Sequence, residues 1–286
     1  MKKIRLLLPL LLTTAFGFSQ TAVPKAISSG KIILNNGQKI ISASNITVDA
    51  DLSMGMTLNS SYATENVLEV KSNTDKTYNL SSTLTKLKVD FDMMGQAINY
   101  DSEKKQEPTS EIEKSFAEKL NKPVDVILDN TTGKATLSQK KENPEGMDTE
   151  NPVNGMLNVF SESSDDAVVS GAFELIPAGK TIGDNWTDTI KEKDASTIRT
   201  YTLKSITGNE ALLLLDMTIT AKNKMEMQGM EFEFKSTTKT TGEITTDTQT
   251  GQVKNKTTKS KITGSIQMMG QDVPISATVN STATYK

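Results

Sequence analysis

The sequence of 286 residues has no cysteine, no histidine and few aromatic side chains, which make up 5% of it. Without cysteine the protein has no disulfide, thiol nucleophile or thiolate metal ligand, and without histidine it lacks the commonest general base. Arginine occurs only at Arg5 and Arg199, and the formal net charge of −3 opposes binding to nucleic acid. We therefore expect a protein that is not an enzyme and that needs neither a cofactor nor a metal ion.

The first 19 residues have the pattern of a secretory signal peptide. Three positive charges within the first five residues precede the apolar run 6–12, and the small residues Gly17 and Ser19 predict cleavage before Gln20. The apolar run is too short to span a bilayer, and no cysteine follows it that could carry a lipid anchor. We expect a periplasmic or secreted protein, not a lipoprotein, without a transmembrane segment and with a formal net charge of −6 after cleavage.

Apolar residues alternate with threonine, serine and lysine over most of the remaining chain. The alternation is clear at 77–84, 217–220, 230–234 and 273–279, and it predicts antiparallel strands with one wet face. The continuous apolar run 211–215 predicts a strand that is buried on both faces, with a short helix as the alternative that periodicity alone leaves open.

Three segments in the middle of the chain favour helices. Ser110 and Glu113 have the spacing of a capping box, and the apolar stripe that follows them ends before Pro123. Pro152 begins a second stripe that continues to 160, and a weaker third helix covers 165–175.

These elements predict a β-dominated α+β fold, in which a large, curved, half-barrel-like antiparallel sheet packs on two or three helices. We expect a single β-rich domain over 20–286. A division into two related halves, 20–140 and 150–286, joined by a polar linker near 140–150, remains an open alternative.

Nine of the 13 methionines fall in four short segments that also contain glycine and lie between alternating stretches, which predicts that these segments are hairpin tips. Methionine at such tips either fills irregular packing, or lines a mouth for a variable apolar ligand, or binds Cu(I) through Met-x-Met pairs. Cu(I) sites often add histidine or cysteine, which are absent here, so we expect no metal. The predicted ligand-lining residues are Met54, Met56, Met93, Met94, Met225, Met227, Met268 and Met269.

Other patterns predict turns or solvated faces and not catalytic sites. The segments 129–133 and 247–251 both begin with aspartate and end with glycine, which predicts two turns of the same kind. A phosphate-binding loop at 174–181 fails because Glu174 stands where the motif requires glycine. The acidic pairs at 165–166 and at 184 and 188 are assigned to solvated faces.

The leader, Asp90–Gln96, the helical middle, the Pro177–Trp186 segment with its Gly-Asp-Asn-Trp sequence, and the threonine-rich tail together resemble a known family. It is the exported bacterial domain family of unknown function numbered 6263, common in Bacteroidota. The resemblance covers most of the mature chain and implies no catalytic residues. At the level of the fold, the chain is also similar to periplasmic lipoprotein carriers, which implies an apolar cavity between a curved sheet and helices.

We expect the protein to bind an apolar or amphiphilic, lipid-like ligand in the hollow of its sheet. The alternative is a structural or interaction module of the cell envelope with a solid core and a protein or glycan partner.

Overall fold

The computed structural model describes residues 30–51, 57–93, 96–104, 107–139, 164–227, 230–268 and 271–286. Its strands are β1 (Lys39–Asp51), β2 (Thr57–Asn73), β3 (Thr77–Met93), β4 (Gln96–Asp101), β5 (Pro123–Asp129), β6 (Ala135–Leu137), β7 (Asn185–Lys191), β8 (Ala195–Thr207), β9 (Glu210–Met227), β10 (Met230–Asp247), β11 (Val253–Met268) and β12 (Gln271–Tyr285). Its helices are α1 (Glu111–Lys119) and α3 (Asp165–Gly171).

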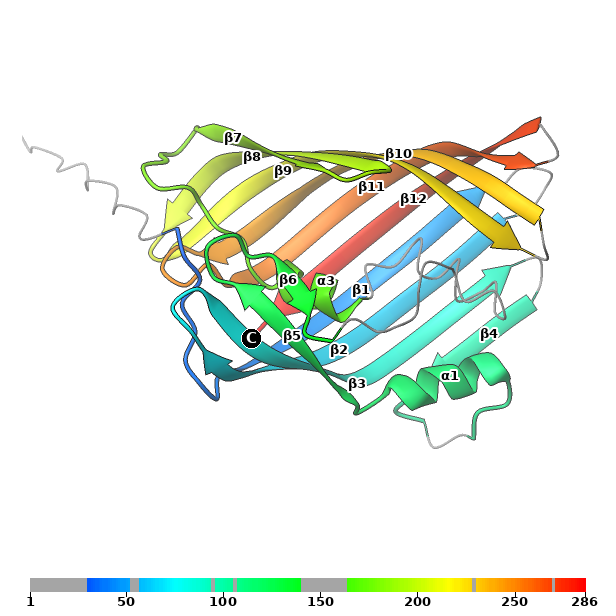
Figure 1. Ribbon diagram of the computed structural model, residues 1–286, viewed down its shortest axis with the longest axis horizontal. Helices are drawn as coiled ribbons and strands as arrows, with labels where there is room; N and C mark the ends of the chain where they lie inside the picture. The colour runs from blue at the N-terminus through cyan, green and yellow to red at the C-terminus, as the bar shows by residue number, and fades with distance from the viewer. Residues whose placement is uncertain are drawn as a thin grey trace, which may run out of the picture.

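All twelve strands belong to one antiparallel sheet (Figure 1). Their order is β6-β5-β3-β2-β1-β12-β11-β10-β9-β8-β7, and β4 pairs with β3 beyond the end of β5. The last strand pairs with the first, Ser42–Asp51 against Ser276–Tyr285, so the two halves of the chain meet at the β1–β12 ladder. The sheet is therefore continuous across both halves.

The alternation in the sequence becomes two distinct faces of this sheet. On β1, Ile40, Ser42, Val48 and Ala50 are buried, whereas the residues between them are exposed or half-buried. The cross-strand register continues this buried set through all neighbouring strands. We call the face with these residues the inner face and the opposite one the outer face.

The inner face carries two apolar clusters, one toward each end of the strands. The first includes Leu68, Leu203 and Leu213, and it also receives Val169 of α3 and Ile32 from the segment before β1. The second joins residues of β1–β3 to residues of β10–β12 and to α1. Figure 1 shows the sheet curved into a trough with α3 on the concave side, so the inner face lines the trough.

The four Met/Gly segments lie where the sequence predicts, between consecutive paired strands. Asp51 pairs with Thr57, Met93 with Gln96, Met227 with Met230, and Met268 with Gln271. The antiparallel register places all four connections on the same side of the sheet, at the ends of the strands. The strand pairing that four hairpins require is therefore confirmed, with all four connections at the same ends of the strands, whereas the glycines predicted at their tips lie outside the described residues.

The two turns that begin with aspartate and end with glycine have the same geometry, as predicted. The Oδ1 atom of Asp129 accepts hydrogen bonds from the backbone N–H groups two and three residues on, and that of Asp247 does the same. Gly133 and Gly251 close the turns with φ values of 71° and 74°, a conformation that glycine adopts without strain.

Helix α1 forms where the capping box predicts it. The Ser110 Oγ atom accepts from the Glu113 N–H group, and the Glu113 carboxylate accepts from the Thr109 N–H group. Phe116 is buried and lies 5.6 Å from Tyr100 of β4, measured between ring centroids. The helix predicted at 152–160 and the linker at 140–150 lie outside the described residues.

Two predictions about local structure need correction. The third helix ends at Gly171 and not at 175, because Phe173 bridges to Gln252 and the segment continues extended. The apolar run 211–215 is a strand, but Leu212 and Leu214 are only half-buried. The two described helices are short, so they cover only part of the sheet.

Candidate functional site

Between the two apolar clusters, many inner-face side chains are half-buried and not buried. We call this region the central band. The register of β8 to β12 aligns Arg199, Met217, Thr240, Ser260 and Val279 in one row across it. The half-buried members of the band are Ile46, Trp186, Asp188, Arg199, Met217, Thr258, Ser260, Val279 and Ser281.

The central band mixes apolar side chains with hydroxyl groups. Ile46 and Val279 pack against one apolar cluster, and Trp186 and Met217 pack against the other. The Ser260 hydroxyl lies 2.8 Å from the hydroxyl of its cross-strand neighbour Thr240. A surface of this kind suits a ligand with both apolar and polar parts.

An ion pair and an aromatic stack lie at the β7–β8 end of the central band. The Arg199 guanidinium donates to the Asp188 carboxylate from the neighbouring strand. Trp186 stacks on Tyr201 with ring centroids 5.4 Å apart and planes inclined by 17°. The Lys180 ammonium lies 5.8 Å from the centroid of the Trp186 ring.

Glu174, in the segment after α3, adds a carboxyl group to this set of charged and aromatic side chains. Its backbone N–H group donates to the carbonyl of Gly251, which ties the segment to the β10–β11 turn. The Tyr201 hydroxyl donates to the Glu174 carboxyl group at 3.2 Å. Burial raises the pKa of this carboxyl group, although the positive charges of Arg199 and Lys256 oppose the shift. Burial therefore favours the neutral form of Glu174.

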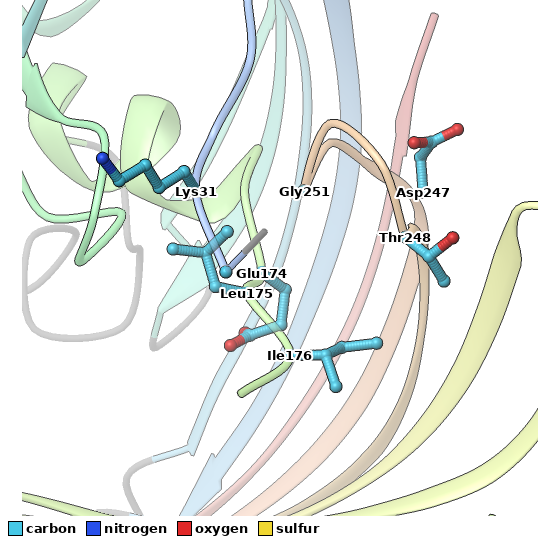
Figure 2. Close-up of a pocket in the computed structure, with 8 residues that line it drawn as sticks. Lys31, Glu174, Leu175, Ile176, Asp247, Thr248 and Gly251 are labelled. Atoms are coloured by element: carbon cyan, nitrogen blue, oxygen red, sulfur yellow. The ribbon is translucent and has the colours of Figure 1, made fainter. Parts of the chain in front are cut away.

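A small pocket lies beside Glu174, between this segment and the β10–β11 turn (Figure 2). In Figure 2 the Glu174 carboxyl group points away from Asp247 and Thr248. The cavity volume is about 10 Å³, which is room for about one water molecule. The pocket is therefore too small for a lipid-like ligand.

A larger groove of about 370 Å³ lies between β4 and the N-terminal half of α1. Its lining is mainly polar and includes Asp101, Lys104, Glu107 and Glu113, with Tyr100 as the aromatic member. Glu113 is already engaged by the Thr109 N–H and hydroxyl groups. The groove does not have the apolar lining that a lipid chain requires.

Half of the eight predicted ligand-lining methionines lie outside the described residues. Met54, Met56, Met94 and Met269 lie outside the described residues, as do the predicted cleavage residues Ser19 and Gln20. For Met93, Met225, Met227 and Met268 the structure describes the backbone, at or near the ends of β3, β9 and β11. The lining role of the eight methionines therefore stays a prediction.

The structure also changes the assignment of several acidic residues. Asp184 and Asp188 are both half-buried and not on a fully solvated face. Asp184 accepts from the Thr181 N–H group at 2.9 Å within a turn, Asp188 is paired with Arg199, and Asp165 accepts from the Ser82 hydroxyl at 2.9 Å. Sequence reasoning missed these pairs because only the fold brings the partners together.

One signal in the sequence could have identified the charged end of the band. Arg199 is the one arginine after Arg5, and it alternates with Tyr201 and Leu203 on the apolar positions of its strand. An arginine at a core-facing position needs a partner, so this pattern indicates a polar group on the inner face.

Among the described residues, no cluster of three or more acidic side chains could hold a metal ion. No helix in the same part of the chain is long and apolar enough to cross a membrane.

A family model described as a family of unknown function (DUF6263) matches residues 75–253. No curated protein matches the chain. A solved structure described as "lipid-protein interactions in lipovitellin" is similar with a TM-score of 0.51 and 12% identity, over 89% of this chain. The chain spans only 25% of that lipovitellin chain, and the likeness shows the fold alone.

Two bacterial structures are similar with lower scores. OccK5 (OpdH) of Pseudomonas aeruginosa has a TM-score of 0.27 at 7% identity, over 89% of this chain and 99% of that chain. An outer membrane channel from Pseudomonas putida F1 has a TM-score of 0.25 at 9% identity, over 89% and 97%. These scores are too low to show a shared fold.

Proposed function

The chain belongs to the DUF6263 family of unknown function, and from its geometry we propose that it binds an apolar or amphiphilic, lipid-like ligand in the trough of its sheet. We propose further that it is an exported protein of the cell envelope, periplasmic or secreted after loss of residues 1–19, and that it is not an enzyme. The absence of cysteine and histidine from the sequence supports the last point.

The central band is the observation that carries the proposal. A sheet with a solid core over its whole inner face would bury the middle of each strand best, because the strand ends are nearest to solvent. Here the middle of the inner face is half-buried, and Ile46, Trp186, Met217 and Val279 are apolar side chains within it. Covering them with an apolar chain would contribute about 25 cal/mol for each Å² of apolar surface removed from water.

The likeness to lipovitellin supports the same proposal at the level of the fold. That structure is described by its lipid–protein interactions, and this chain matches a quarter of it. A large open antiparallel sheet with an apolar concave face is suited to hold molecules of variable length, because no fixed cavity limits their size.

We propose that the eight tip methionines extend the lining of the trough toward the strand ends that the four hairpins join. The four hairpins meet at that end of the strands, on the far side of the second apolar cluster from the central band. Unbranched thioether side chains adapt to ligands of different shape.

The test is native mass spectrometry of residues 20–286 purified from a periplasm, with solvent extraction of the same sample. We expect bound mass in the lipid range that is lost on denaturation. A bare polypeptide mass, together with no binding of added fatty acid or lysolipid, would refute the proposal.

Adjacent residues of β12 provide matched variants for the same measurement. Val279 lies in the central band and Thr278 lies on the outer face. Val279→Glu should weaken binding because it places a charge in the trough, whereas Thr278→Glu should leave binding unchanged. If Val279→Glu does not fold by circular dichroism, Met217→Gln changes the polarity of the band at nearly constant side-chain length.

A specific observation also favours the second candidate, an interaction module of the envelope. The apolar clusters at both ends of the trough are buried, and the pocket at Glu174 admits about one water molecule. This module predicts a protein that carries no small molecule and that captures a protein or glycan of the envelope. The mass measurement separates the two functions.

A further inference from the structure

The positively charged side chains on the two faces of the sheet have different surroundings. On the outer face, Lys222 and Lys235 both lie 2.8 Å from the Glu233 carboxylate, and Lys204 lies 3.0 Å from Glu243. Such exposed pairs are ordinary for a solvated sheet. Arg199 and Lys256 are instead on the inner face, where apolar side chains and hydroxyl groups surround them.

Lys256 lies among apolar residues of the inner face. Its cross-strand neighbours are Ile244 on β10 and Ala283 on β12, and Ile244 is 1% exposed. Within the part of the chain that the structure describes, no carboxylate lies within ion-pair distance of Lys256. A half-buried ammonium without a close partner is costly, and an anion beside it would recover this free energy.

Arg199 has unused hydrogen-bonding capacity. One terminal nitrogen binds Asp188, and the Nε–H group is buried without a partner among the described residues. The side chain is 33% exposed, so the guanidinium can be reached from the trough. A guanidinium has five N–H donors and commonly binds two anionic groups at once.

The carboxyl group of Glu174 lies within electrostatic range of both cations. The charges of both Arg199 and Lys256 act on its carboxyl group, and Tyr201 donates to it. Burial favours the neutral form of Glu174 because it raises the pKa. Arg199 is paired with Asp188, so Lys256 is the cation of this group that has no carboxylate at ion-pair distance among the described residues.

We propose that Arg199 and Lys256 bind the headgroup of the ligand, which is an anionic amphiphile. The headgroup is a carboxylate or a phosphate that accepts from the Arg199 guanidinium, with Lys256 contributing its charge. The apolar chain then lies over Met217 and Val279 in the central band. This inference rests on the proposed function and specifies the chemical class of the ligand.

The experiment compares the affinity of the mature protein for three lipids with the same oleoyl chain. Oleate supplies a carboxylate, oleoyl lysophosphatidate supplies a phosphate, and monoolein is uncharged. The quantity measured is the ratio of anionic to uncharged affinity, which cancels the contribution of the shared chain. The larger ratio of the two anionic lipids distinguishes a carboxylate from a phosphate headgroup.

Substitutions on both faces of the sheet test the assignment. Arg199→Gln should lower the ratio about tenfold, the loss expected for a hydrogen bond to a charged group. Lys256→Gln should lower it about threefold, as expected for a charge that acts at longer range. Lys259→Gln removes an exposed outer-face charge from the same strand and should leave the ratio unchanged.

The outcomes separate the inference from the proposed function. If all three lipids bind and neither inner-face substitution changes the ratio, the anionic headgroup site is wrong and the lipid-binding function stands. If only Arg199→Gln lowers the ratio, the role of Lys256 is wrong. If none of the three lipids binds the unaltered protein, the proposed function itself fails and the inference fails with it.

Discussion

The raised pKa of the half-buried Glu174 predicts an unusual dependence of stability on pH. Its neighbours are Asp188, Arg199 and Tyr201 on β7 and β8, and Lys256 on β11. Because burial raises its pKa above the ordinary value of 4.5, the folded protein holds a proton that the unfolded chain has released. The stability from this group is fully present below about pH 4.5 and is lost as the pH rises through the folded pKa.

The magnitude follows from proton linkage. Between the unfolded and folded pKa values, the free energy of unfolding falls by about 1.4 kcal/mol for each pH unit. Glu174→Gln keeps the size of the side chain and an acceptor for the Tyr201 hydroxyl, but it does not titrate. We therefore expect the variant to gain stability relative to the unaltered protein as the pH rises, until the pH exceeds the folded pKa.

The assay is urea unfolding of both proteins at a series of pH values from about 4 to about 8, compared as a difference curve. Glu243→Gln is the control, because Glu243 is exposed on the outer face and pairs with Lys204. It should shift stability by less than about 1 kcal/mol over the same range. A Glu174→Gln difference that is flat across the range would refute the argument that burial raises the pKa of this carboxyl group.

Two further predictions concern stability. Leu213→Ala should lower the free energy of unfolding, measured in urea, by about 2–5 kcal/mol because Leu213 is fully buried. Ile198→Thr on the exposed outer face should change it by less than about 0.5 kcal/mol. Equal costs would contradict the assignment of the two faces. Hydrogen bonds from Thr131 and Thr132 hold the pKa of Asp129 at about 2. Asp129→Ala should therefore lower the free energy of unfolding by about 1 kcal/mol at neutral pH, after allowance for the exposure of the side chain. This cost should shrink as the pH falls from 3.8 toward about 2, because the carboxylate is then protonated. A cost independent of pH would mean that the Asp129 charge does not stabilise the turn.

Local features of the fold could be predicted because each depends on residues that are close in sequence. Ser110 and Glu113 are three residues apart, so their contact with the first helical turn forms in any helix that begins there. The turns at 129–133 and 247–251 likewise depend on one aspartate and one glycine within five residues. Alternation alone also indicated which positions would be buried on most strands.

The end of α3 could not be predicted in the same way. Residues 172–175 have no strong helix breaker, but Phe173 and Glu174 bind the backbone at 251–252, and these bonds compete with the helix. Similarly, the run 211–215 does not show which face will be covered, because the covering layer comes from elsewhere in the chain.

The candidate site depended on tertiary structure for a related reason. Glu174 and Lys256 are far apart in sequence, and only the path of the segment after α3 over the sheet brings their charges together. The pairing of β1 with β12 joins the two ends of the chain in the middle of the sheet, and no local pattern specifies it.

Composition and local pattern were enough to predict the chemistry that the protein lacks, the strands with their two faces, and the four Met/Gly hairpins. These follow from composition and from the period of two, which act over a few residues. The tertiary structure alone decided the order of the strands, the half-buried central band, and the grouping of Arg199 with Asp188, Glu174 and Lys256. Contacts between distant strands depend on how the whole sheet curves, and short-range preferences do not encode that curvature.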